Sequence, residues 1–220
     1  MELNADFSKK AIVHSTDEPW VASPLPGVDR RMLDRIGDEH ATRATTIVRY
    51  KAGSSFSSHT HGGGEEFMVL DGIFSDEHGD YPAGTYVRNP VGSKHTPHSE
   101  NGCIIYVKLG QMHPDDQDFV RVDSNNTSWK SGSVTGTESM HLHTYGGENI
   151  ALMRCHPGTN FQPELSGNGT EILVLDGQIE DGQHSSSKGT WVRYPGTGKC
   201  DLFTKDGCTL LIKTGHLEGL

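Results

Sequence analysis

The segment GSSFSSHTHGGGEEFMVLDG, residues 53–72, carries the side chains of this chain best suited to chemistry. His59 and His61 are one residue apart, and side chains in a strand alternate between faces, so both imidazoles should point the same way. Three glycines permit a tight reversal, after which Glu65 or Glu66 offers a carboxylate at the start of the next strand. Two imidazoles and a carboxylate on one face could grip a metal ion.

A later segment supplies a third imidazole. GTYVRNPVGSKH, residues 84–95, brings in His95 shortly after a Pro-Val-Gly turn. Three neutral imidazoles and one carboxylate suit a divalent iron, manganese, nickel, copper or zinc ion. The simpler alternative is a polar loop with solvated histidines.

The chain repeats itself at an offset of 105 residues. RYKAGSSFSSHTHGGGEEFMVLDG, which starts at Arg49, aligns without a gap to RCHPGTNFQPELSGNGTEILVLDG, which starts at Arg154. The register continues from PAGTYVRNPVGSKH to SKGTWVRYPGTGKC and from NGCIIYVKLG to DGCTLLIKTG. A shared register of this length indicates two copies of one fold.

The second copy has lost the metal-binding residue types. In the repeat register, the counterparts of the three histidines and Glu65 are Glu164, Ser166, Thr170 and Cys200. Hydroxyl groups are poor ligands, so we expect a degenerate site there. The same backbone therefore tolerates other residues, which favours metal binding over a structural role for the histidines of the first copy.

The elements around these residues are predicted to be strands. Short stretches rich in Val, Ile, Thr, Tyr and Phe are broken about every 8–12 residues by Gly, Pro, Asn or Asp. The best helix signal, MLDRIGDEHA at 32–41, is short, and residues 112–136 form a polar, Asn/Ser-rich linker. The pattern predicts an all-β chain with one antiparallel barrel or sandwich used twice. We place the two domains at residues 1–123 and 124–220.

Two runs of residues match the spacing of a known family. Gly53, His59, His61, Glu65 and Gly72 are separated by five, one, three and six residues and resemble cupin motif 1. Strand parity allows only one of the two adjacent glutamates to join the histidines. The motif selects Glu65, which leaves Glu66 facing away or holding a ligand in place.

The second run resembles cupin motif 2. Gly84, Pro90, Gly92 and His95 are separated by five, one and two residues, and Ser99 stands where the family's motif ends in asparagine. The resemblance implies a double-stranded β-helix, or jelly-roll, in two tandem copies. It also implies a metal held by the three histidines and Glu65. His98, which follows Pro97, is either a surface turn residue or a further candidate for holding the ligands in place.

A closer resemblance is to the cupin domain of ChrR-type zinc anti-sigma factors. HTHGGGEEFMVLDGIFSDEHGDYPAGTYVRNPVGSKHTPHS and WVASPLPGVDRRML carry it, over most of residues 20–110 and more weakly in the second half. It implies a metal-binding regulatory or sensor module that responds to a small molecule or an oxidant. The alternatives are a cupin-type dioxygenase or related small-molecule enzyme, and a storage cupin. One divalent ion is expected, zinc or iron first, with manganese and nickel as further candidates.

Partners and location follow from charge and composition. The anti-sigma factors grip the sigma factor with an N-terminal zinc-binding domain, whereas only residues 1–19 precede Trp20 here and they contain no cysteine, so sigma-factor binding is not expected. A net charge of -10 without a dense Lys/Arg cluster argues against direct nucleic-acid binding. No run approaches the ~20 apolar residues of a membrane helix. With no recognisable secretory signal and no CxxC pair, we expect a cytoplasmic protein, with a small-molecule ligand and a homodimer as candidate partners.

Overall fold

The computed structural model describes residues 1–39, 41–163, 168–196 and 200–217. Every regular element in these ranges is a strand, and the strand pairs are antiparallel. The chain divides into two compact units, residues 1–5 with 18–127, and residues 6–17 with 128–220. The predicted all-β fold with two tandem copies is confirmed. Within the described ranges, no helix is long and apolar enough to cross a membrane.

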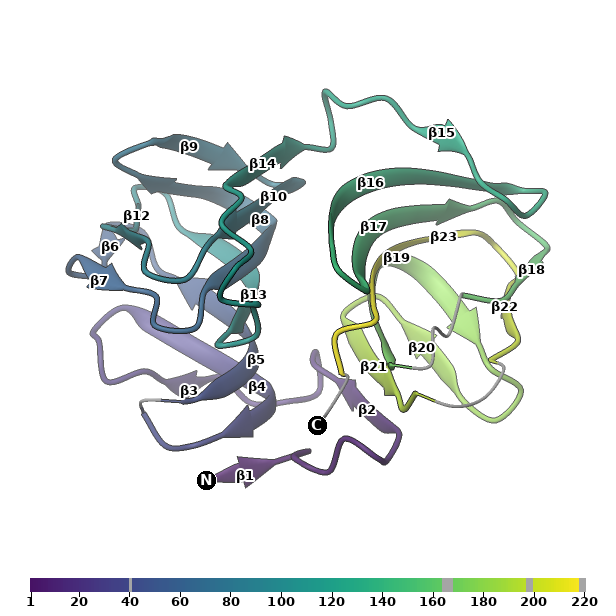
Figure 1. Cartoon of the computed structure of the whole chain (residues 1–220), viewed down its shortest axis with the longest axis horizontal. Helices are drawn as coiled ribbons and strands as arrows, with labels where there is room; N and C mark the ends of the chain where they lie inside the picture. Colours follow the sequence, from purple (N-terminus) through teal and green to yellow (C-terminus); the bar gives the residue numbers. More distant parts are fainter. Residues whose placement is uncertain (40, 164–167, 197–199, 218–220) are drawn as a thin grey trace. The chain divides into compact units, whose positions relative to one another are not determined.

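The first unit contains one large sheet and a small two-stranded one. The main path of the large sheet runs β1-β4-β5-β13-β8-β10-β14. The shorter strands β3, β6, β9 and β12 attach to this path, and β7 pairs with β11 (Figure 1). The strands are β1 (Glu2–Leu3), β3 (Val21–Ala22), β4 (Val28–Ile36), β5 (Arg43–Tyr50), β6 (Ser54–Ser55), β7 (His59–Thr60), β8 (Glu65–Asp76), β9 (Gly79–Pro82), β10 (Thr85–Asn89), β11 (Lys94–His95), β12 (His98–Ser99), β13 (Cys103–Leu109) and β14 (Val120–Asp123).

The second unit repeats this plan. Its sheet runs β15-β16-β17-β23-β19-β21-β2, with β20 and β22 paired to β19 and β18 paired to β22. The strands are β2 (Ala11–His14), β15 (Lys130–Ser131), β16 (Thr137–Tyr145), β17 (Glu148–Cys155), β18 (Thr159–Phe161), β19 (Thr170–Glu180), β20 (Ser185–Ser187), β21 (Thr190–Tyr194), β22 (Leu202–Thr204) and β23 (Cys208–Thr214). The strands predicted from the repeat are therefore all present.

Strand β8 passes from one layer of the first barrel to the other. Its first half pairs with β10 and β13, and its last residues pair with β9 and β12. The crossing falls at Gly72, which has φ 71° and where an added Cβ would lie 2.2 Å from the Gly102 carbonyl oxygen. Gly177 makes the same approach to the Gly207 oxygen at 2.2 Å. The repeated VLDG sequence is therefore a corner that admits only glycine.

Each barrel encloses its own apolar core between the layers. In the first, the core includes Phe67, Phe74 and Tyr81, whose rings are in mutual contact. In the second, it includes Phe161 and Ile172 together with three of the four cysteines, Cys155, Cys200 and Cys208, the first and last of which are directly opposite each other on β17 and β23. All four cysteines are buried and free, as expected for small core residues.

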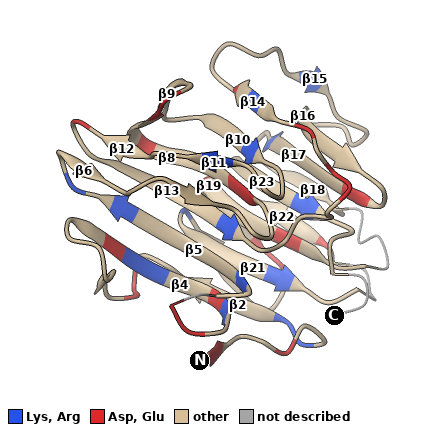
Figure 2. Ribbon diagram, turned by 60° about the vertical axis from the view of Figure 1, so that its left-hand side comes forward, with Lys and Arg blue, Asp and Glu red and all other residues tan. Residues whose placement is uncertain are grey.

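Charged residues of both signs occupy the same strands. On β4, Asp29 and Asp34 are interspersed with three arginines (Figure 2). Arg49 on β5 pairs with Asp29 at 2.6 Å and stacks on Trp20 at 4.3 Å. Pairs of opposite charge on neighbouring strands, such as Asp29 with Arg49, stabilise a sheet.

The two sequence repeats exchange one short strand each. β14 pairs with β10 of the first unit and β2 pairs with β21 of the second, where β2 appears in purple among the later strands (Figure 1). The registers are equivalent, because Val120 faces Arg88 and Ala11 faces Arg193. Val120 also lies 109 residues after Ala11, and Trp129 lies 109 after Trp20. Each repeat therefore gives its first strand to the other barrel.

Three segments differ from what the sequence indicated. Residues 28–36, which overlap the short helix signal at 32–41, form β4, because pairing with β5 satisfies its backbone groups and overrides weak helix propensity. The linker at 112–136 contains β14 as well as polar turns. The compact units differ from the predicted division at residue 123, because residues 6–17 join the second unit through β2 and the first continues to residue 127.

Candidate metal centre

The small two-stranded sheet of β7 and β11, together with the start of β8, positions the four predicted ligands. His59 on β7 lies directly opposite His95 on β11. The ladder continues beyond β7, since the amide of His61 donates to the Ser93 carbonyl at 2.9 Å and the amide of Gly92 donates to the His61 carbonyl at 2.9 Å. The triple glycine then turns the chain tightly, with Gly63 so close to Gly110 that an added Cβ would lie 2.6 Å from its Cα. Glu65 follows at once as the first residue of β8.

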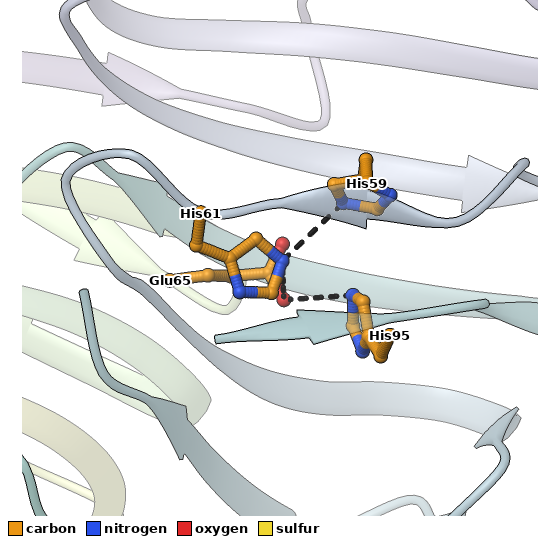
Figure 3. A group of neighbouring side chains, drawn as sticks. All are labelled: His59, His61, Glu65 and His95. Atoms are coloured by element: carbon orange, nitrogen blue, oxygen red, sulfur yellow. Dashed lines mark hydrogen bonds and ion pairs between the residues drawn. The ribbon is translucent and has the colours of Figure 1, made fainter. Parts of the chain in front are cut away.

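The structure brings all four side chains to one point (Figure 3). One donor atom from each residue lies within 4.8 Å of the donors of the other three. The Glu65 Oε1 atom is 3.4 Å from the Nε2 atom of His95 and 3.6 Å from that of His61, whose Nε2 atom is 3.3 Å from that of His59. His61, Glu65 and His95 are buried and His59 is the most accessible, so the cluster faces outward on one side.

Each imidazole is held from behind through its Nδ1 atom. The partners are a carbonyl, a hydroxyl and a carboxylate, so three different groups direct the Nε2 atoms toward one another. The pairs are His59 with the Ser57 carbonyl at 3.2 Å, His61 with the Ser93 hydroxyl at 2.9 Å, and His95 with the Asp76 carboxylate at 3.1 Å. Nδ1 partners of this kind fix ring orientation in metal sites and leave Nε2 free to coordinate.

The surroundings treat the buried histidines differently. Burial lowers the pKa of His61, and the neighbouring imidazoles of His95 and His59 lower it further. The charge of Glu65 raises this pKa but does not outweigh them. Burial also opposes protonation of His95, but the bond to Asp76 and the charge of Glu65 outweigh it and raise its pKa. Asp76 is itself buried, yet its bonds to His95, the His78 amide and the Tyr81 hydroxyl lower its pKa. Asp76 thus stays ionised beneath His95.

The cluster fits a divalent metal ion. The His95 Nε2 atom is buried and has no hydrogen-bond partner among the described residues, and a buried polar atom of this kind is costly unless something satisfies it. Three imidazole nitrogens and a carboxylate are donors that first-row divalent metals accept.

The adjacent glutamates lie on opposite faces of β8. Glu65 joins the histidines, and the Asn89 amide donates to its Oε1 atom at 3.3 Å. Glu66 accepts from the Tyr86 hydroxyl at 2.7 Å and pairs with Arg88 at 2.7 Å. Glu66 therefore belongs to a buried ion pair on the other face.

The second barrel keeps that other face. The counterparts are Glu171, Trp191 and Arg193, with the Trp191 indole donating to Glu171 at 3.4 Å and Arg193 directly opposite Glu171. A glutamate present in both barrels is explained by the fold, whereas Glu65, replaced by Thr170, is not.

His98 and Ser99 are not among the four side chains of the cluster. His98 is exposed on β12, and Ser99 is buried and donates to the Ile73 carbonyl at 2.6 Å. The residues that do hold ligands in place were missed from the sequence. Asn89 and Ser93 flank the Pro-Val-Gly turn of motif 2, which is a usable signal, whereas Asp76 is separated along the chain from its partner His95 by 19 residues.

The second barrel has other groups at the corresponding place. Thr170 and Cys200 are both buried, and Glu164 and Ser166 lie outside the described residues. Asp181, the counterpart of Asp76, forms an ion pair with Lys10 and accepts from the Tyr194 hydroxyl at 3.3 Å. Asp181 thus pairs with a lysine where Asp76 pairs with a histidine, and each of the two aspartates also accepts from a tyrosine hydroxyl.

Two jelly-roll barrels in one chain, with two motif-bearing segments meeting at a histidine cluster, define a bicupin. The sequence matches the family described as the ChrR cupin-like domain over residues 8–113 and again over 117–218, so the chain belongs to that family. No curated protein matches the sequence.

Solved structures share the fold at low identity. A protein of Nostoc punctiforme provisionally described as a dioxygenase aligns with TM-score 0.79 and 15% identity, covering 97% of this chain and 85% of that one. The Escherichia coli pirin YhhW in complex with nickel(II) aligns with TM-score 0.67 and 12% identity, covering 94% and 99%. An oxalate decarboxylase variant of Bacillus subtilis aligns with TM-score 0.64 and 11% identity, covering 93% and 77%. These likenesses show the fold alone.

Proposed function

We propose that the first barrel binds one divalent transition-metal ion through His59, His61, Glu65 and His95. The observation that carries this proposal is the convergence of three Nε2 atoms and a carboxylate within 4.8 Å. It is supported by the partners that hold each Nδ1 atom and by the buried Nε2 atom of His95, which has no hydrogen-bond partner among the described residues.

Zinc and iron are the ions we put first, followed by manganese and nickel. A set of three nitrogens and one oxygen discriminates weakly among them, and supply in the cell often decides. Nickel is the ion named for YhhW. A bound ion would supply Lewis acidity at the mouth of the barrel.

The role we propose is that of a regulatory or sensor module that responds to a small molecule or an oxidant. Membership of the ChrR cupin-like family supports this role. The accessible position of His59 supports it as well, because a small ligand could approach the ion from that side while the other three donors stay buried. The partners we propose are therefore a small molecule and a second copy of the chain, with neither nucleic acid nor a sigma factor bound directly.

The second candidate is a cupin-type dioxygenase or related small-molecule enzyme. The same accessible side favours it, since four protein donors would leave room on an octahedral ion for a substrate oxygen. The Nostoc punctiforme neighbour adds a fold-level analogy, which does not by itself establish an activity.

Elemental analysis with metal-edge X-ray absorption on anaerobically purified protein tests the proposal. Zinc with four protein ligands and no water supports the regulatory module. Iron or manganese with six light-atom neighbours, some of them water, supports the enzyme. Protein that holds no stoichiometric metal and takes up none of these ions would overturn the metal centre itself.

A further inference from the structure

A strand that belongs in sequence to the second repeat lies behind the metal centre of the first barrel. The second family match begins at residue 117, and β14 follows at Val120–Asp123. β14 pairs with β10, with Arg121 directly opposite Val87. The guanidinium of Arg121 donates to the backbone carbonyls of Arg88 and Val120, both at 2.8 Å, which fixes its position.

One chain of hydrogen bonds runs from Arg121 to the carboxylate ligand. An Nη atom of Arg121 donates to the Asn89 side-chain oxygen at 2.5 Å. The amide nitrogen of Asn89 in turn donates to the Glu65 Oε1 atom at 3.3 Å. Asn89 is buried, and accepting from Arg121 orients its amide so that the NH2 group faces Glu65.

A second chain runs from the same guanidinium to a histidine ligand. The Nε atom of Arg121 donates to the Tyr81 hydroxyl at 3.3 Å, and that hydroxyl donates to Asp76 at 3.0 Å. The other oxygen of Asp76 is 3.1 Å from the Nδ1 atom of His95. One side chain thus supports two ligands of the cluster, through Asn89 in one case and through Tyr81 and Asp76 in the other.

The second barrel shows that the fold does not need this network. The equivalent strand β2 places Ile12 where β14 places Arg121, and Ile12 packs against the apolar core. Asn89 and Tyr81 correspond to Tyr194 and Ser186. The arginine and two of the three intermediates, Asn89 and Tyr81, are replaced in the barrel whose ligands are replaced. The third intermediate, Asp76, is kept as Asp181, and the outer-face Glu66 and Arg88 are kept as Glu171 and Arg193.

We propose that Arg121 is a positioning residue of the metal centre, so that metal affinity in the first barrel depends on the docking of a strand from the second repeat. This inference rests on the proposed function, since it concerns affinity for the ion. Loss of groups that orient metal ligands typically weakens binding 10–100-fold. Metal affinity would thereby depend on whether β14, from the second repeat, is correctly paired with β10 in the first barrel.

The test is a zinc titration of the full-length apoprotein against a competing chelator. Arg121→Met removes the hydrogen bonds while keeping much of the side-chain volume, and Arg121→Lys keeps the charge and one reachable partner. Arg49→Met is the matched control, because it removes a guanidinium that pairs with Asp29 on the other face of the same barrel. The cobalt(II) absorption spectrum and the melting temperature of each apoprotein complete the set.

We expect Arg121→Met to bind zinc roughly 10–100-fold more weakly, with an altered cobalt spectrum. Arg121→Lys should recover part of the affinity, and the control should stay within about twofold of wild type. Wild-type affinity in Arg121→Met, or an equal loss in the control, would overturn the inference. If Arg121→Met does not fold, Tyr81→Phe removes one hydroxyl from the same network and should weaken zinc binding several-fold, with unchanged affinity counting against the inference.

The two proposals fail in different ways. Wild-type protein that binds no divalent metal would overturn the proposed function and this inference together. Wild-type protein that binds zinc as tightly as Arg121→Met would overturn only the inference.

Discussion

Two adjacent positions on equivalent strands show where the two barrels agree and where they differ. Glu66 and Glu171 are both buried and both face an arginine, so this face is the same in each barrel. One residue earlier, Glu65 and Thr170 differ completely. The comparison separates residues that the jelly-roll needs from residues that it merely positions, because the second barrel folds without the latter. The candidate metal ligands are therefore side chains that the fold positions but does not require.

The largest expected effect is on metal binding. It comes from a change at His95, with the same change at the equivalent Cys200 as the comparison. His95→Ala should weaken metal binding by more than the roughly 10–100-fold cost of losing a supporting group, because it removes a donor outright. Cys200→Ala, at the equivalent position, should leave metal content unchanged at one ion per chain. Elemental analysis of dialysed protein measures both. Two ions per wild-type chain would break the comparison by showing that the second barrel also binds metal.

Metal removal should affect only the first barrel. An ion present at 100 times its dissociation constant stabilises the folded state by about 2.7 kcal/mol, and the strands that carry its ligands gain most. Hydrogen exchange of β7 and β11 should accelerate on chelation, while that of β18 and β22 stays the same. Equal acceleration in both barrels would show that the ion stabilises the chain as a whole.

The adjacent glutamates allow a sharper version of the comparison. Glu66→Gln should lower the free energy of unfolding by about 1–3 kcal/mol, because Arg88 loses a charged, hydrogen-bonded partner. It should leave metal affinity close to wild type. Glu65→Gln should do the reverse, with a large loss of metal and little loss of stability in the apoprotein. Urea denaturation and chelator competition measure the two quantities, and a loss of metal from Glu66→Gln would mean that the two faces are coupled.

The smallest expected effect concerns the ion pair between Lys10 and Asp181 in the second barrel. Burial raises the pKa of Asp181, but the bond from Lys10 and two backbone amides outweigh it, so the net pKa lies well below its ordinary value. Lys10→Met should cost about 0.5–1 kcal/mol at neutral pH, whereas a change at Phe119, the exposed counterpart of Lys10 in the other repeat, should cost nothing measurable.

The pH dependence of that effect has a definite sign. A depressed folded-state pKa stabilises the protein above the ordinary aspartate pKa of 3.8 and loses its contribution as pH falls from there through the folded-state value. The difference in unfolding free energy between wild type and Lys10→Met should therefore shrink below about pH 4. A difference that persists unchanged into that range would show that Lys10 acts through packing instead.

Much of this arrangement could be predicted from residue spacing. The glycines at 72 and 177 are required by backbone contact, and alternation along β7 fixes the side on which His59 and His61 lie. Such local constraints leave a regular trace in the sequence. That is why the strands, the repeat and the grouping of the four candidate ligands could be predicted, together with the replacement of Glu65 by Thr170.

The supporting residues left no such trace. Asp76 contacts His95, which lies 19 positions later in the chain, and Arg121 contacts Tyr81, which lies 40 positions earlier. Both are tertiary contacts. β14 was interpreted as linker because its polar neighbours mask a stretch of only four residues. Its pairing with β10 depends on the whole barrel, which no window of sequence contains.

The exchanged strands also bear on how a protein of this kind can be assembled. A chain with a single repeat would have to obtain its missing strand from another molecule, so its folding would depend on protein concentration. Joining two repeats turns that encounter into an intramolecular one, for which short linkers provide effective concentrations in the millimolar range. The covalent connection thus makes each barrel's completion independent of dilution, and cutting the chain between the repeats should make it concentration-dependent again.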